Sequence, residues 1–528
     1  MTRSATNILD VRGRQGLLLA AVVLAAVFLI IASGSEHYWD EYFYLYSVLA
    51  HEPAGLLQME PQLGGLFPPG FYAGKIGFIY LLDGLVDLLG GGPQSLAMIN
   101  AVFSVLAILT ALASYALIVQ LLPGRDALPV TVIILFSPLL IYFNGKVMTE
   151  LPSLLMAILA AASFLKSFNA PARNKYFWLL LATILLFAAV WLRFIVVVFY
   201  AGMIIGLFVL NDSRYPFTKV FVRALLTGTG SVVLLLLAWL VMLDDPAGSI
   251  GGLVGNLSNR SQGVIIRLYA LVMFVQLFGL YIFAALWRPG SAQFRFAATW
   301  ALLATLPFLL GSSYAEPRFF YMALIPLAML VYLGMRVLSD RWPAVFAGYR
   351  GWLMFALVVV VNRAVFVPLM PIEHDQEAYQ ALVSKDMNNQ ANAQYMTPWV
   401  SDYSLLKFIY PHASVYLVMD WAYDGDEGFF SSSAFQRWVG ADNYLANYAE
   451  LSKLPQPWHY AGWDYSPVIK RMQSMSEKLG IPVQGINEGQ KNHLELGWPW
   501  NDKNLARRMQ LTDGHYEIHA LFPLDSDR

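Results

Sequence analysis

Long apolar runs separated by short polar segments dominate the chain between residues 16 and 367. The first run, Gly16–Ser33, carries no charge and is long enough to cross a bilayer as a helix. Ten further runs of comparable character follow, so the pattern predicts about eleven transmembrane helices. The later spans are approximately Leu96–Leu122, Leu128–Phe143, Leu151–Leu165, Tyr176–Trp191, Phe194–Leu210, Val222–Leu243, Val264–Trp287, Phe296–Leu310, Phe319–Met335 and Trp352–Val367.

One apolar stretch, Gly70–Gly90, is interpreted differently. It contains Lys75, Asp83 and Asp87, and three charges are expensive at the centre of a bilayer. The two aspartates are four residues apart and share one helical face. We therefore predict an amphipathic helix on the membrane surface, and a second one over Tyr38–His51.

Positive charge gives the orientation. Arg3, Arg12 and Arg14 precede the first span, which predicts a cytoplasmic N-terminus. With Gly70–Gly90 at the surface, the cytoplasmic loops carry most of the cations and the chain ends outside. The predicted inner cations are Arg125, Lys166, Arg173, Lys175, Arg214, Lys219, Arg223, Arg288, Arg295, Arg336, Arg341 and Arg350.

The composition changes after Pro371, where the chain becomes polar and contains no apolar run of membrane-spanning length. Ala413–Met419 is typical of a strand, and Ser466–Leu479, followed by Gly480, is typical of a helix. We expect two domains: a membrane domain, residues 1–370, and a soluble α+β domain, residues 371–528, on the outer face.

The overall composition agrees with a polytopic membrane protein. Hydrophobic residues make up 58% of the chain and charged residues 13%, about half the charged share of a typical soluble domain. The net charge of −1 gives no indication of nucleic-acid binding. Cysteine is absent, which excludes disulfides, thiolate metal sites and a cysteine nucleophile.

Four polar clusters fall on the predicted outer face: residues 37–44 with the acids Asp40 and Glu41, the turn at 67–72, the loop at 144–152 with Glu150, and residues 316–321. A carboxylate within hydrogen-bond reach can take a proton from an acceptor hydroxyl or amine, and an arginine can hold a leaving phosphate. Asp40, Glu41 and Glu150 are therefore the candidate catalytic acids. The candidate binding residues are Tyr72, Lys75, Lys146, Arg193, Glu316, Arg318 and Tyr321.

Each cluster also has a plain structural interpretation. Acids at a helix start interact with the helix dipole or cap it, as Asp40, Glu41 and Glu150 would. A lone Arg318 can be an interfacial side chain that reaches toward water, and Lys75 can face solvent on its amphipathic helix. The functional interpretation depends on the four clusters lying on the same side of the membrane.

In order and sidedness, these segments resemble the C-type (GT-C) membrane glycosyltransferases over about residues 16–332, most closely the protein O-mannosyltransferase and bacterial aminoarabinose-transferase group. The shared features are an acidic pair after the first span (Trp39-Asp40-Glu41-Tyr42), a proline-aromatic turn with a surface helix, an acid before proline (Glu150-Leu151-Pro152) and an arginine-aromatic run (Arg318-Phe319-Phe320-Tyr321).

The resemblance implies transfer of a sugar, with inversion, from a polyprenyl-phosphate-sugar to a periplasmic acceptor in the inner membrane of a bacterium. It implies Asp40 as the general base, Glu150 as the second-loop acid, and Arg318, assisted by Lys75 or Lys146, as the phosphate ligand. It implies no nucleotide sugar and no essential metal. The acceptor stays open between lipid A or core, an envelope polysaccharide and a protein.

Departures from the family pattern bear on the phosphate ligands. In the aminoarabinose group a basic residue closely follows the acid pair and a lysine precedes the turn proline, whereas this chain has Tyr42 and Phe43, then Phe67 and Pro68. Other cations must therefore bind a phosphate here, or the donor differs. The second-loop acid is commonly Asp, and Glu150 is one methylene longer.

Two other functions stay as alternatives. A transporter or flippase of a lipid-linked substrate would carry ionisable residues inside its spans and internal repeats, whereas the predicted spans are almost free of charge and no repeat is visible. A non-catalytic scaffold for envelope assembly would use residues 371–528 to bind a partner.

Overall fold

The computed structural model describes most of the chain between residues 36 and 366 and short parts of the remainder. The described ranges are 36–37, 39–59, 71–90, 93–249, 251, 264–310, 317–366, 374–375, 394–397, 403–404, 407, 414–418, 437, 439–440, 444–445, 458–462 and 517–521. The predicted first span, Gly16–Ser33, and the predicted helix Ser466–Leu479 lie outside these residues.

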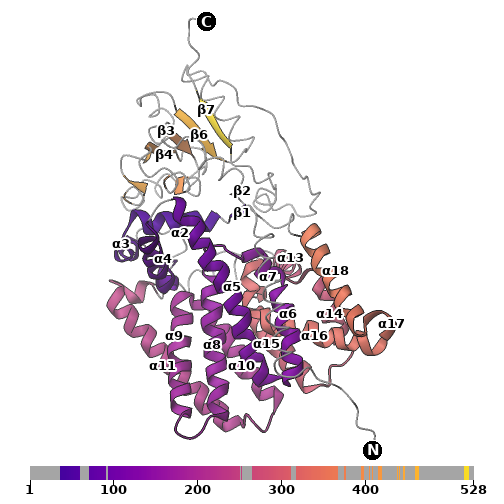
Figure 1. Ribbon diagram of the computed structural model, residues 1–528. Helices are drawn as coiled ribbons and strands as arrows, with labels where there is room; N and C mark the ends of the chain where they lie inside the picture. Colours follow the sequence, from indigo (N-terminus) through magenta and orange to yellow (C-terminus); the bar gives the residue numbers. More distant parts are fainter. Residues whose placement is uncertain are drawn as a thin grey trace, which may run out of the picture.

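The described part before residue 367 is almost entirely helical, and it forms one bundle (Figure 1). Seven of its helices are long and apolar enough to cross a membrane, and Asp126–Leu135 and Phe194–Leu210 are shorter apolar helices. The seven are Met98–Leu121, Glu150–Asn169, Lys175–Leu192, Phe217–Met242, Arg267–Ala285, Ala292–Leu310 and Pro317–Arg341.

The helices follow the predicted apolar runs closely because each run is long enough to bury or to face lipid along its whole length. The bounds are α5 (Pro93–Leu121), α6 (Gly124–Leu135), α7 (Pro138–Phe143), α8 (Glu150–Asn169), α9 (Lys175–Leu192), η3 (Phe194–Val196), α10 (Val197–Leu210), α11 (Phe217–Met242), α13 (Val264–Val275), η4 (Gln276–Phe278), α14 (Gly279–Ala285), α15 (Ala292–Leu310), η5 (Pro317–Ala323), α16 (Leu324–Arg341), α17 (Pro343–Phe346) and α18 (Tyr349–Phe366).

The segment before α5, predicted to be the first outer loop, is helical where it is described and lies at one end of the bundle. It comprises α2 (Trp39–Ala50), α3 (Pro53–Met59), η2 (Ala73–Lys75) and α4 (Ile76–Leu89). In Figure 1 these elements sit at the bundle end nearest the strands. Helix α4, where a surface helix was predicted, is not among the candidate membrane spans.

Two predicted spans are interrupted. The run Leu128–Phe143 forms α6 and α7, separated at Ser137, whose hydroxyl accepts from the Leu140 amide at 3.3 Å and is followed by Pro138. The run Val264–Trp287 breaks at Gln276, a buried residue with φ of 51°. There the Leu277 amide donates to the Asn362 side chain of α18 at 3.0 Å instead of continuing a helical ladder.

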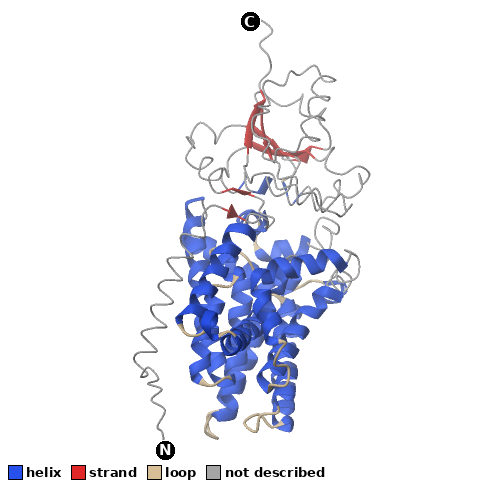
Figure 2. Cartoon of the chain, turned by 90° about the vertical axis from the view of Figure 1, so that its right-hand side faces the viewer, coloured by secondary structure: helices blue, strands red, loops and turns tan. Residues whose placement is uncertain are grey.

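The described residues after 371 contain strands. A five-stranded sheet has the order β5-β4-β3-β6-β7, parallel except for the β6–β7 pair, and β1 (Glu36–His37) pairs antiparallel with β2 (His374–Asp375). Figure 2 shows the sheet beyond one end of the bundle. The sheet strands are β3 (Gln394–Thr397), β4 (Ser414–Val418), β5 (Tyr444–Leu445), β6 (Trp458–Gly462) and β7 (Glu517–Leu521).

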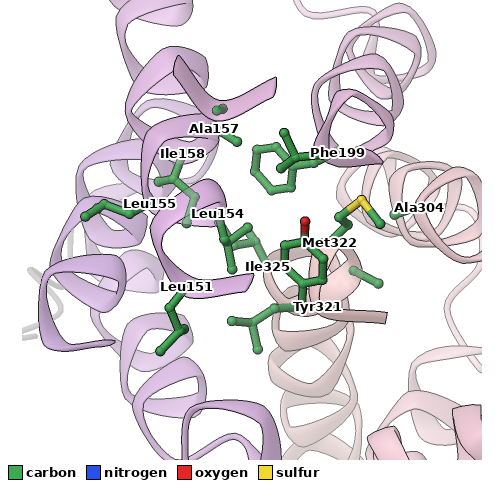
Figure 3. Packing of buried hydrophobic residues seen from close by; sticks show 14 of the residues in the cluster. Leu151, Leu154, Leu155, Ala157, Ile158, Phe199, Ala304, Tyr321, Met322 and Ile325 are labelled. Atoms are coloured by element: carbon green, nitrogen blue, oxygen red, sulfur yellow. The ribbon is translucent and has the colours of Figure 1, made fainter. Parts of the chain in front are cut away.

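Buried apolar side chains join α8 to α10, α15 and α16. Figure 3 shows Leu154 of α8 pointing toward Phe199 of α10 and Met322 of η5, with Leu151 and Ile158 on the adjacent turns of α8. All five are buried. This packing fixes the start of α8 against the start of the η5–α16 span, which is where the polar clusters gather.

Candidate functional site

The acid pair that follows the first predicted span lies at the start of α2. Asp40 is the second residue of this helix, and the placement of its side chain lies outside what the structure describes. Glu41 is completely buried, and its Oε2 accepts a hydrogen bond from the Val147 amide at 3.0 Å. The buried Glu41 carboxylate therefore connects the start of α2 to the loop that precedes α8.

The second acid, Glu150, forms the centre of a buried ion cluster. It is the first residue of α8 and is 1% exposed. Its Oε1 lies 2.5 Å from Nη1 of Arg193 and 3.8 Å from Nε of Arg318. The two arginines come from the end of α9 and from η5, so three separate segments of the chain converge on one carboxylate.

The Arg193 side chain is held on several sides. It donates to the Thr149 hydroxyl as well as to Glu150, and its guanidinium lies 5.5 Å from the Phe319 ring centroid and 5.4 Å from that of Tyr321. Although burial lowers it, the adjacent Glu150 carboxylate holds the pKa of Arg193 above its ordinary value. Arg193 is therefore a fixed positive charge at this end of the bundle.

Lys75 lies in an aromatic cage. Its Nζ donates to the Tyr44 hydroxyl at 2.5 Å and lies 3.4 Å from the Phe71 ring centroid. It also interacts electrostatically with Glu150. Lys75 therefore belongs to the same electrostatic site as Glu150. Unlike Glu150, it is only partly buried.

The two predicted tyrosines brace neighbouring helices. The Tyr72 hydroxyl lies 2.9 Å from the Ser47 hydroxyl of α2, and the Tyr321 hydroxyl lies 3.3 Å from the Ser153 hydroxyl of α8. Both tyrosines are completely buried. Through these hydroxyl contacts Tyr72 connects to α2 and Tyr321 connects η5 to α8.

The loop that precedes α8 is packed tightly against the bundle. Lys146 is buried, and the preceding Gly145 has φ of 73°. A Cβ at position 145 would stand 3.0 Å from the Ser104 hydroxyl of α5. The positive φ and this close approach both require glycine, which keeps the loop against α5 and near Glu41. Glu316, the remaining candidate, lies outside the described residues.

Several site residues were not selected from the sequence. Tyr44, Phe71, Thr149 and Phe319 contact the predicted cations. A usable signal exists for Tyr44, which lies four residues after Asp40 and so on the same side of a helix. The contact of Arg318 with Met148 at 3.9 Å has no such signal, because the two residues are 170 positions apart.

Charges of both signs are concentrated at this end of the bundle. Three described cations, Lys75, Arg193 and Arg318, interact with the Glu150 carboxylate. Such a set suits a phosphate group because guanidinium groups bind phosphate oxygens in pairs. Within the described residues no group of three His, Cys, Asp or Glu side chains could hold a metal ion.

Comparison with known proteins relates the fold to solved structures. No protein-family model and no curated sequence matches the chain. Crystal structures of ArnT from Cupriavidus metallidurans align with it in the apo state, at a TM-score of 0.53 and 14% identity, and bound to undecaprenyl phosphate, at a TM-score of 0.53 and 13% identity. Each alignment covers 89% of this chain and 96% of ArnT.

A second kind of structure aligns over a somewhat shorter range. It is the archaeal oligosaccharyltransferase AglB from Archaeoglobus fulgidus in complex with an inhibitory peptide and a dolichol-phosphate, with a TM-score of 0.50 and 14% identity. That alignment covers 84% of this chain and 69% of AglB. With its helical bundle, the helices α2 to α4 at one bundle end and the strands beyond that end, this chain has the fold seen in the ArnT structures.

Proposed function

We propose that this protein is a membrane glycosyltransferase that moves a sugar from a polyprenyl-phosphate-linked donor to a periplasmic acceptor. The observation that carries the proposal is the cluster of Glu150, Arg193 and Arg318, with Lys75 beside it, at the bundle end that bears the Asp40–Glu41 helix. The undecaprenyl phosphate in the ArnT structure and the dolichol-phosphate in the AglB structure favour the same donor class.

The donor phosphate would bind to the positive side of this cluster. Arg318 and Lys75 are the proposed ligands, because both interact with Glu150 from different segments and Lys75 is partly exposed. Lys146 is proposed to contribute its charge from the second loop. Glu150 then acts as a positioning residue that orients the Arg318 guanidinium. The ion pair with Arg193 holds the Glu150 carboxylate in place.

Asp40 is proposed as the general base. In this step its carboxylate takes the proton of the acceptor hydroxyl or amine, and the acceptor oxygen or nitrogen forms a bond to the anomeric carbon. The bond between that carbon and the phosphate oxygen breaks, and polyprenyl phosphate leaves with the electron pair. Attack opposite to the leaving group inverts the anomeric carbon.

The location is proposed to be the inner membrane of a bacterium, with the site and residues 371–528 on the periplasmic side. The cation distribution supports this orientation, because most of the arginine and lysine residues in the loops between predicted spans fall on the predicted inner side. The acceptor is proposed to be lipid A or core, an envelope polysaccharide or a protein.

The direct test is release of polyprenyl phosphate from a synthetic polyprenyl-phosphate-sugar by the purified protein, followed by mass spectrometry of the glycosylated acceptor. We expect wild-type protein to release the lipid phosphate and Asp40→Asn protein to fold normally with at least 100-fold lower turnover, because general-base catalysis contributes about 10²–10⁴-fold. Full turnover by Asp40→Asn would remove Asp40 as the base.

The rival functions make different predictions in the same assay. A flippase would move the intact donor across a proteoliposome without releasing polyprenyl phosphate. A scaffold would neither cleave nor move it. Transport without cleavage at every acceptor tested would contradict the enzyme proposal.

A further inference from the structure

A second charged cluster lies at the far end of the bundle from the proposed active site. Arg223 of α11 donates to the hydroxyl of Ser167, near the end of α8, at 2.9 Å. Ser167 is 17 residues beyond Glu150 on the same helix, which corresponds to about 25 Å along its axis. The two clusters therefore occupy opposite ends of α8 (Figure 1).

Arg223 is half-buried, and its charge has no carboxylate partner within the part of the chain that the structure describes. Its guanidinium lies 4.2 Å from the Phe168 ring centroid and also interacts with the Tyr176 phenol of α9. A hydroxyl and two aromatic rings orient the guanidinium without neutralising it. A partly desolvated cation in this state favours an anionic partner.

The surroundings strengthen the positive field. Lys219 lies one helical turn before Arg223 on α11, and four further cations lie in the adjacent segments: Lys166, Arg173, Lys175 and Arg214. Among the described residues from 166 to 223 the only acid is Asp212, which is bound to Arg214 at 2.7 Å. The first turns of α11 add the positive end of a helix dipole to this set.

The side chains next to the cluster show which kind of anion fits. Tyr176 and Phe177 at the start of α9, and Phe221 and Val222 beside Arg223 on α11, are each more than half exposed, so both helices carry exposed apolar side chains at this end. On a transmembrane helix such side chains face acyl chains. An anion bound there must present a charged oxygen beside hydrocarbon, which is the chemistry of a phospholipid and not of a dissolved phosphate ion.

We propose that Arg223, Ser167 and the neighbouring cations form a binding site for the phosphate headgroup of an anionic phospholipid, between the ends of α8, α9 and α11. In this site the guanidinium binds the phosphate oxygens, Lys219 adds a second positive charge, and the exposed rings of Tyr176 and Phe177 contact the acyl chains. The proposal is independent of the transfer reaction proposed above.

Native mass spectrometry of the full-length protein in detergent provides the test, with phosphatidylglycerol, phosphatidylcholine and inorganic phosphate as the three probes. We expect phosphatidylglycerol to bind wild-type protein at least tenfold more tightly than phosphatidylcholine, and Arg223→Gln to reduce that affinity about tenfold. Arg288→Gln is the matched control, because the Arg288 charge is already paired with Asp340 at 2.9 Å.

The opposite results would overturn the proposal. Equal binding of phosphatidylglycerol and phosphatidylcholine, or unchanged binding by Arg223→Gln, would show that the cluster selects no anionic lipid. Phosphate binding as tight as that of the lipid would assign the site to a soluble anion. If Arg223→Gln does not fold, Lys219→Gln, an exposed substitution, must lower the affinity severalfold, and unchanged binding by that variant counts against the site in the same way.

Discussion

At the scale of single residues, the site is organised by carboxylates that neutralise and orient cations. Glu150 has two arginine neighbours and almost no contact with solvent, and Glu41 is buried against a backbone amide of the second loop. A buried charge is tolerated only when it is paired and hydrogen-bonded. Both glutamates therefore have a structural role that Asp40 is not shown to share.

Replacing Glu150 tests this role. Glu150→Gln leaves Arg193 and Arg318 buried beside a neutral amide, and breaking a buried ion pair costs about 3–5 kcal/mol. We expect the free energy of unfolding, measured in mixed detergent micelles, to fall by about that amount.

The control for this substitution is Asp212→Asn. Asp212 pairs with Arg214 at 2.7 Å in an exposed loop, where the arginine side chain is 48% exposed. Because water screens such pairs, this substitution should cost less than about 1 kcal/mol. Equal losses in the two variants would show that the Glu150 cluster is not effectively desolvated.

At the scale of elements, close helix contacts and one interrupted span determine how the bundle packs. The break at Gln276 separates α13 from α14, and α14 approaches α16 most closely where Gly334 faces Tyr281. A Cβ at position 334 would stand 1.8 Å from the Tyr281 carbonyl oxygen, well inside any permitted contact. Glycine at this position allows the two backbones to touch, as small residues do in membrane bundles.

Gly334→Ala should therefore force α14 away from α16. We expect a loss of several kcal/mol in stability, seen as a markedly lower unfolding temperature in detergent, because the obstacle is backbone and not a movable side chain. Gly228→Ala on α11 is the matched control, since no atom lies within 4 Å of the added methyl group. That substitution should be neutral or stabilising by up to about 1 kcal/mol. A Gly334→Ala protein as stable as wild type would contradict the α14–α16 contact.

At the scale of the whole molecule, the part of the chain after residue 371 contacts the helix that bears the acid pair through Tyr403. The Tyr46 hydroxyl of α2 donates to the Tyr403 hydroxyl at 3.4 Å, and Tyr403 in turn donates to the Val439 carbonyl. Burial raises the pKa of Tyr46 to about 12, against a smaller lowering by Tyr403. The β1–β2 pair forms a second connection just before α2. Tyr403, Val439 and β2 thus help to hold α2 in place.

Tyr403→Phe removes the shared hydroxyl while keeping the ring. We expect the contact to weaken by about 1 kcal/mol, so amide hydrogen exchange in α2, measured by mass spectrometry, should rise about fivefold. Tyr416→Phe in β4, whose hydroxyl has no described hydrogen bond, should leave exchange in α2 unchanged. Identical exchange in wild-type protein and Tyr403→Phe would show that this contact does not restrain α2.

The sequence by itself determined the helices and the gathering of Glu41, Lys75, Glu150 and Arg318 at one end of the bundle, whereas the surface position of residues 70–90 stays a prediction. These features depend on local quantities, namely the length of an apolar run compared with a bilayer and the cost of charge within it. The strand Ser414–Val418 was predicted on similar local grounds, within Ala413–Met419.

Only the tertiary structure decided which groups pair. Glu150 is the partner of Arg193 and Arg318, 43 and 168 positions away, and Glu41 is the partner of Val147, 106 positions away. The break at Gln276 likewise depends on Asn362. Ion pairing and backbone capping across such separations follow from how the helices pack, and an apolar pattern along one helix contains no information about the charge that another helix brings to it.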